Sequence, residues 1–167
     1  MSADGPGVAL PDGRFAGRDD FRQLVRDALA SAAHEGWPEL ILSDANFEDW
    51  PLGERAVAQS LSDWSRSGRR CILLARRYDA VLRQHARFVT WRKTWSHIIE
   101  ARACPSADEL ELPSAIWSPH WVMQRLDAER SSGVSGREPQ RRLLLREQLN
   151  EWLQKSSPAF PAVTLGL

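Results

Sequence analysis

Lysine, cysteine and tyrosine are scarce in this sequence of 167 residues, which holds two lysines, two cysteines and one tyrosine. Two cysteines cannot form a disulfide framework, and Cys71 and Cys104 do not lie at the spacing of a metal-binding pair. No apolar run approaches the length of a membrane-spanning helix, and residues 1–13 lack the pattern of a signal peptide. We therefore expect a cytoplasmic protein with no membrane segment and no cofactor.

The formal net charge is zero, but the charges are unevenly distributed along the chain. Residues 1–65 contain five basic and twelve acidic side chains, a net −7, whereas residues 66–102 contain ten basic and two acidic side chains, a net +8. Either the basic segment binds a phosphate-bearing ligand, or the acidic first third neutralises it within the fold.

Arginine and tryptophan are abundant, with twenty arginines and eight tryptophans. The guanidinium fork suits phosphate recognition. A GC-rich coding sequence gives the same arginine bias without any function, and we favour that explanation. Tryptophan either packs in a core or supplies flat binding surface, and at this abundance we favour core packing.

Apolar periodicity predicts an α/β fold, a mixed sheet flanked by helices, in one domain over residues 14–167 after a flexible leader at 1–13. Buried strands at 39–43 and 71–75 enclose a helix that ends with Gly68 as its C′ residue, forming a βαβ unit. The other expected elements are an edge strand at 14–16, a helix from Asp19 stopped by Gly36, a long helix from Tyr78 to Trp95, and a helix at 138–155. The inward residues predicted for this last helix are Leu144, Leu145, Leu149 and Trp152.

Residues 97–104 either continue the long helix or form a third buried strand. Residues 114–127 form two short strands or one strand broken at Pro119, and residues 131–136 read as a turn. We expect residues 157–167 to be an ordered, extended tail, because its apolar side chains would otherwise be exposed to water. These side chains are Phe160, Val163, Leu165 and Leu167.

His120 and Asp127 form a candidate catalytic pair, separated by six residues and followed by the stretch Gly133-Val134-Ser135-Gly136. This arrangement resembles the signature of the phospholipase D family, and the predicted order of elements resembles one half of that fold. In the family, the histidine attacks phosphorus and the acid orients the imidazole. A lysine two residues after the histidine neutralises phosphate oxygens, and Val122 stands at that position here.

The resemblance implies a degenerate, single-motif phospholipase D-like domain. It also implies a homodimer, because family members with one motif generally pair two copies. Because Val122 cannot supply the missing charge, we favour a non-catalytic domain that binds a protein partner or a phosphate-containing ligand. The alternative is a phosphodiesterase or nuclease with His120 as its nucleophile. Residues 91–97 and 158–167 are also similar to proteobacterial proteins without an assigned activity.

The basic and aromatic segment at 76–102 is a second candidate site, and nucleic acid is the partner it suggests as a further alternative. Its cations would hold phosphates while bases stack on its indole rings. The residues assigned to ligand binding are Arg87, Trp91, Arg92, Lys93 and Trp95. Phe88, Trp91 and Trp95 also have the spacing of a core-facing helix stripe, and we favour packing for them.

Three carboxylates, Asp44, Glu48 and Asp49, follow the buried strand at 39–43. The carboxyl edge of an open α/β sheet is where ligands gather, and several carboxylates there could hold Mg²⁺. Aspartate and asparagine are also the ordinary residues of such turns. We therefore assign no metal site.

Overall fold

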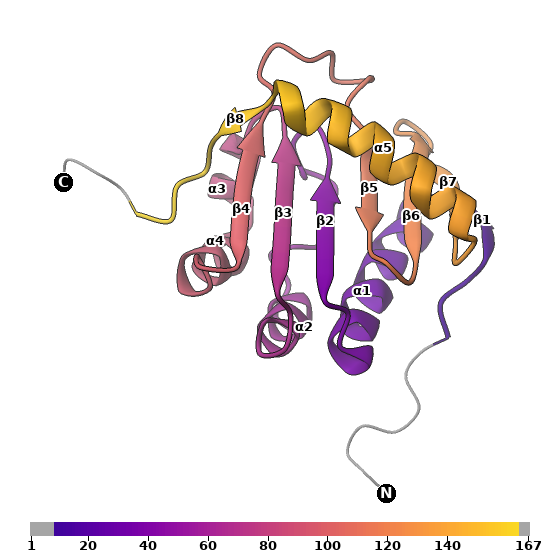
Figure 1. The fold of residues 1–167 in the computed structure, drawn as a ribbon, viewed down its shortest axis with the longest axis horizontal. Helices are drawn as coiled ribbons and strands as arrows, with labels where there is room; N and C mark the ends of the chain where they lie inside the picture. The colour runs from indigo at the N-terminus through magenta and orange to yellow at the C-terminus, as the bar shows by residue number, and fades with distance from the viewer. Residues whose placement is uncertain (1–8, 164–167) are drawn as a thin grey trace, which may run out of the picture.

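The computed structural model describes residues 9–163 and confirms the α/β fold, an eight-stranded mixed sheet flanked by helices (Figure 1). Most of the predicted leader lies outside the described residues. The helices are α1 (Arg18–Glu35), α2 (Arg55–Ser65), α3 (Asp79–Gln84), α4 (Ala86–Thr94) and α5 (Pro139–Lys155). The strands are β1 (Gly13–Phe15), β2 (Glu39–Ser43), β3 (Arg70–Ala75), β4 (Ile99–Ala103), β5 (Ser114–Trp117), β6 (Val122–Asp127), β7 (Ser132–Gly136) and β8 (Ser157–Pro158).

The sheet has a parallel centre with antiparallel flanks, in the order β1-β7-β6-β5-β2-β3-β4-β8. Strands β2, β3 and β4 are parallel to one another, and the remaining neighbours pair antiparallel. The carboxyl ends of β2, β3 and β4 therefore meet at one edge of the sheet. Because β5 is antiparallel to β2, and β6 to β5, the start of β5 and the end of β6 lie at that same edge.

Side-chain alternation along the strands divides the core into two apolar layers. Leu40 and Leu42 of β2 pack in the layer under α1 to α4, whereas Ile41 packs with Leu145 and Leu149 of α5. Figure 1 shows α5 lying alone across one face of the sheet. Among residues 9–163, no helix combines the length and the apolar character that crossing a membrane requires.

Most of the tryptophans are core residues, as their abundance predicted: six of the eight are buried. Trp64 donates its indole N–H to the Trp37 carbonyl at 2.6 Å, which ties α2 to the start of β2. Gly68 is not the left-handed C′ residue that we predicted, since α2 ends at Arg66 in a right-handed conformation. Glycine is needed at position 68 because a Cβ there would lie 2.4 Å from the Trp64 ring. At the end of α1, Gly36 does have the predicted left-handed conformation, with φ 68°.

The long helix predicted from Tyr78 to Trp95 is wrong, because the chain breaks at His85 into α3 and α4. His85 has φ −121° and ψ 60°, outside the helical region. Its buried imidazole Nε2 lies 2.8 Å from the Phe47 carbonyl. This contact, with a residue 38 positions away, is absent from the local periodicity that predicted one helix.

Pairing with neighbouring strands determines the secondary structure of the segments for which the sequence allowed two alternatives. Residues 99–103 form the third parallel strand, β4, and residues 114–127 form the two strands β5 and β6. The predicted turn at 131–136 is wrong, because residues 132–136 form β7 between β6 and β1. Gly133 allows this close approach, since a Cβ there would lie 2.0 Å from the Gln124 carbonyl oxygen.

The two C-terminal segments differ from their predictions in detail. Leu145 and Leu149 of α5 are buried as predicted and the half-buried Trp152 packs against the same layer, but Leu144 is wrong, since it is 56% exposed. In the tail, β8 pairs with β4 and Phe160 is buried, whereas Val163 is exposed. The last predicted tail residues, Leu165 and Leu167, lie outside the described range.

Candidate functional site

Two pockets of opposite charge lie at the carboxyl edge of the parallel strands. The larger, of about 660 Å³, extends from the end of β2 to the end of β6. Seven carboxylate residues line it: Asp44, Glu48, Asp49, Glu109, Glu111, Asp127 and Glu129. Among the described residues, Arg125 is the one basic residue that lines it, so this acidic pocket repels anions.

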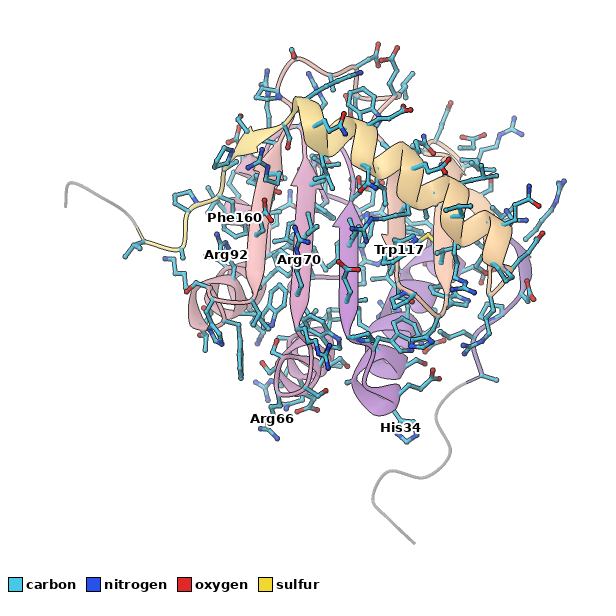
Figure 2. All side chains as sticks on the ribbon, viewed as in Figure 1. His34, Arg66, Arg70, Arg92, Trp117 and Phe160 are labelled. Atoms are coloured by element: carbon cyan, nitrogen blue, oxygen red, sulfur yellow. The ribbon has the colours of Figure 1, made fainter. Side chains whose placement is uncertain are left out.

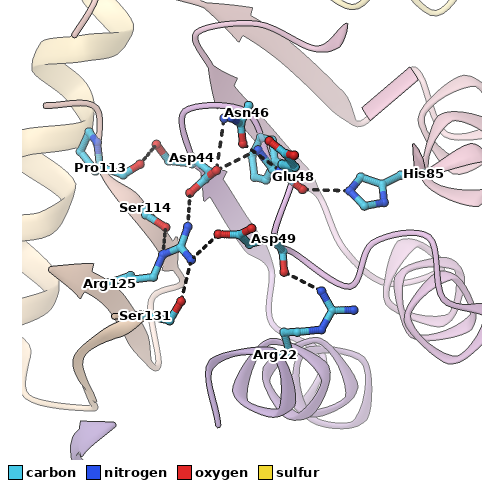
Figure 3. Close-up of polar contacts among 12 residues, drawn as sticks. Arg22, Asp44, Asn46, Glu48, Asp49, His85, Pro113, Ser114, Arg125 and Ser131 are labelled. Carbon is cyan, nitrogen blue, oxygen red and sulfur yellow. Dashed lines mark hydrogen bonds and ion pairs between the residues drawn. The ribbon is translucent and has the colours of Figure 1, made fainter. Parts of the chain in front are cut away.

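Arg125 is neutralised within the acidic pocket (Figure 3). Its guanidinium contacts the Asp44 carboxylate at 3.1 Å and the Asp49 carboxylate at 3.2 Å. It also donates to the hydroxyl groups of Ser114 and Ser131. This network joins the loop after β2 to β5 and β6, and it leaves no cationic group in the pocket for a ligand.

Two of the three carboxylates considered as Mg²⁺ ligands, Asp44 and Asp49, have structural partners. Asp44 accepts hydrogen bonds from the backbone N–H groups of Asn46 and Phe47, in addition to its contact with Arg125. Within residues 9–163, no group of three histidine, cysteine or acidic side chains is arranged to hold a metal ion. Asp44 therefore shapes the turn after β2, which is the ordinary role of such a residue.

The structure does not bring His120 and Asp127 together. His120 is exposed in the turn between β5 and β6, where its backbone N–H donates to Ser118 Oγ at 3.1 Å. Asp127 is the last residue of β6 and accepts a hydrogen bond from the Arg130 backbone N–H. Because a strand rises about 3.3 Å per residue, the length of β6 separates the two side chains by roughly 20 Å.

Val122, which stands at the position of the family's lysine, is buried in the apolar layer under α5. Arg125 is on the opposite face of β6, where its guanidinium lies 4.2 Å from the centre of the Phe21 ring of α1. Arg125 therefore cannot replace the missing lysine beside His120.

The ion pairs of the acidic first third involve arginines outside the basic segment 66–102. Five acidic residues pair in this way: Glu54 with Arg22 and Arg26, Asp44 and Asp49 with Arg125, Glu35 with Arg137, and Glu39 with Arg146. Arg70 and Arg102 pair with Glu100 of the same segment. Neutralisation of the basic segment by the first third, one of our two predictions, is therefore not observed among these contacts.

The remaining cations around α3 and α4 form what we call the basic end. Its residues are Arg76, Arg77, Arg83, Arg87, Arg92 and Lys93, and the one acidic residue among them is Asp79. Across the described residues, none of these six cations has an ion-pair partner within 4.0 Å, whereas eight of the other fifteen arginines have one. The positive charge of the basic end is therefore not cancelled by neighbouring carboxylates.

The five predicted ligand-binding residues do not share one surface. Trp91 is buried and donates its indole N–H to Ser65 Oγ at 2.8 Å, so it packs as the helix stripe indicated. Arg92 is buried beside Phe160 (Figure 2), donating to the Phe160 and Ile99 carbonyls, and burial lowers the pKa of its guanidinium. Arg87 and Lys93 are exposed, and Trp95 is half-buried.

The second pocket lies within the basic end, at the carboxyl ends of β3 and β4, and has a volume of about 520 Å³. We call it the Arg76 pocket. Arg76, Arg77 and Lys93 line it together with apolar side chains and Asp79. The sequence placed Arg76 and Arg77 in the basic segment without assigning them to a site. The sequence did contain a signal for this pocket. Two consecutive arginines directly follow a buried strand, and ligands of α/β folds bind beyond such strand ends.

Comparison with known proteins supports the fold. No protein-family model and no curated protein matches this sequence. The fold is similar to the solved structure of TrmBL2, an archaeal chromatin protein that shows a novel mode of DNA binding, with a TM-score of 0.66 and 15% sequence identity. The match covers 93% of this chain but 56% of the TrmBL2 chain, so this chain spans little more than half the length of that protein.

Proposed function

We propose that this domain is a non-catalytic module that binds the phosphate groups of nucleic acid through its basic end. The observation that carries the proposal is the absence of ion-pair partners, among the described residues, for the cations around α3 and α4. Cations that are not paired within the protein can release the counterions of a phosphate backbone, which drives sequence-independent binding.

The distribution of exposed charge supports this surface over the rest of the carboxyl edge. Arg77, Arg83, Arg87 and Lys93 are exposed, and Arg76 is half-buried. The acidic pocket beside them repels phosphate, so a polyanion would be directed to the basic end. The fold of TrmBL2, whose function includes DNA binding, agrees with this class of partner.

The test is fluorescence anisotropy of labelled single-stranded and duplex oligonucleotides, measured across a salt titration. We expect affinity to fall steeply between about 50 and 200 mM salt. The variant Arg83→Gln/Arg87→Gln removes two exposed cations from α3 and α4. It should lower affinity at about 50 mM salt by tenfold or more and reduce the single-strand salt slope by about 1.4.

Arg66→Gln/Arg69→Gln is the matched control, because it removes two exposed arginines of the same basic segment near the start of β3, at the opposite edge of the sheet. Its affinity should stay within about twofold of the unmodified protein if the basic end is the site. Absence of binding at low salt, or equal losses in both variants, would refute the proposal.

A further inference from the structure

The Arg76 pocket combines a cationic rim with apolar walls, a composition that a nucleic-acid backbone alone does not use. Its volume of about 520 Å³ is that of a small-molecule site. Leu82 of α3, Val89 of α4 and Phe160 of the C-terminal segment form apolar parts of its lining. Leu82 is 58% exposed, so an apolar group in the pocket would cover a leucine now in contact with water.

The charges around the pocket match a dianion. Arg76, Arg77 and Lys93 supply three positive charges and Asp79 one negative charge, which leaves a net +2. A phosphate monoester carries about −1.5 to −2 at neutral pH.

Hydrogen bonds hold the pocket walls in place before any ligand binds. The backbone N–H of Arg76 donates to the Ala45 carbonyl at 2.9 Å, which fixes the loop after β3. On the other side, Arg92 Nε donates to the Phe160 carbonyl at 3.0 Å, and the Phe160 ring stacks on Tyr78 with centroids 4.9 Å apart. A wall fixed in this way loses little conformational entropy on binding.

We infer that the Arg76 pocket binds a small phosphate monoester whose organic part is apolar. The inference deepens the proposed function, because it uses cations of the same basic end and specifies the ligand that one part of it takes. Arg76, Arg77 and Lys93 contact the phosphate, and the organic group packs between Leu82, Val89 and Phe160.

The experiment is an NMR titration of the ¹⁵N-labelled full chain with phenyl phosphate, inorganic phosphate and phenol as separate probes. Phenyl phosphate should shift the amide signals of Arg77, Leu82 and Val89, and it should bind at least about tenfold more tightly than inorganic phosphate. Phenol should bind more weakly than phenyl phosphate by a similar factor, because it lacks the dianion. Equal affinity for phenyl phosphate and either of the other probes would overturn the inference.

Arg77→Gln/Lys93→Gln changes two exposed residues of the pocket and should lower the affinity for phenyl phosphate by about tenfold or more. Arg83→Gln/Arg87→Gln changes two residues outside the pocket lining. It should leave the affinity for phenyl phosphate unchanged while it lowers the affinity for nucleic acid. The two variants therefore test the monoester pocket and the nucleic-acid surface independently. Loss of phenyl phosphate binding in both variants, or no localised shifts in the unmodified protein, overturns this inference and leaves the nucleic-acid result standing.

A further comparison identifies the source of the monoester. If the pocket takes the end of a nucleic acid, a 5′-phosphate should raise oligonucleotide affinity in the unmodified protein and have no effect in Arg77→Gln/Lys93→Gln. If the pocket takes a free ester, phenyl phosphate binds as described and the 5′-phosphate changes nothing. The second result supports the inference as stated, whereas the first overturns its small apolar ester in favour of the phosphorylated end of a nucleic acid.

Discussion

Arg125 connects three parts of the chain through one buried guanidinium. The side chains of Arg125 and Asp44 are 4% and 5% exposed, so the ion pair between them is shielded from water. A buried carboxylate without its cation is strongly destabilising, because desolvation is then uncompensated. The pair therefore adds a buried link between residues 81 positions apart, across strands β2 and β6 that both pair with β5.

We predict that Arg125→Met lowers the free energy of unfolding by about 3–5 kcal/mol, because methionine keeps the apolar stem but leaves Asp44 buried and unpaired. Arg130→Met is the control, since Arg130 is 85% exposed and reaches Asp127 at 4.0 Å. That substitution should change the free energy by less than about 0.5 kcal/mol. Urea unfolding measures both values, and comparable losses in the two variants would contradict the prediction.

The C-terminal segment after α5 closes the far edge of the sheet. Residues 157–158 pair with β4, and the Ala159 backbone N–H donates to the Ala101 carbonyl at 3.0 Å. Phe160 then enters the apolar layer between Tyr78 and Phe88, although its φ of 47° is unusual for a residue with a side chain. Burial of the Phe160 ring offsets this backbone strain, which costs about 1–3 kcal/mol.

We predict that Phe160→Ala destabilises the protein by about 3–5 kcal/mol, because it removes a buried ring and leaves a cavity beside Tyr78. Val163→Ala should be nearly neutral, since Val163 is 69% exposed. Thermal and urea unfolding of both variants provide the measurement. If Phe160→Ala melts at the temperature of the unmodified protein, the tail does not contribute to the core as described.

The elements that the sequence predicted well are those whose signals are local. Helix α1 and strands β2 and β3 follow from apolar spacing, and Gly36 ends α1 by its own conformational preference. The break at His85 and strand β7 were not predicted, because contacts with distant segments produce them. In the candidate site, the sequence gives the net positive charge of segment 66–102. It does not show that the cations of the basic end lack ion-pair partners, because that depends on which arginines the acidic residues contact across the fold.

At the scale of the whole molecule, the chain is electrically neutral but has a strongly polarised carboxyl edge. The acidic pocket is lined by seven carboxylates, and the basic end, with its unpaired cations, lies around the ends of β3 and β4. Within residues 9–163, the ion pairs of the acidic third do not involve the basic segment. Two such surfaces on one molecule are complementary to the same surfaces on a second copy.

We expect the protein to form a homodimer in which the basic end of each copy faces the acidic pocket of the other. A two-fold axis would then form the same contact twice, as closed symmetry requires. Because the contact is electrostatic and partly exposed, salt should weaken it. Light scattering at micromolar concentration should give a dimeric mass at low salt and a falling mass as salt is added.

Two pairs of substitutions make this prediction specific. Glu109→Gln/Glu111→Gln removes two exposed carboxylates from the acidic pocket, and it should shift the low-salt mass toward the monomer. Glu147→Gln/Glu151→Gln removes the same charge from the exposed face of α5 and should leave the mass unchanged. An oligonucleotide that occupies the basic end should also dissociate the dimer, because both partners use the same cations. A monomeric mass for the unmodified protein at low salt would exclude the dimer, and the basic end would then be open to nucleic acid at every salt concentration.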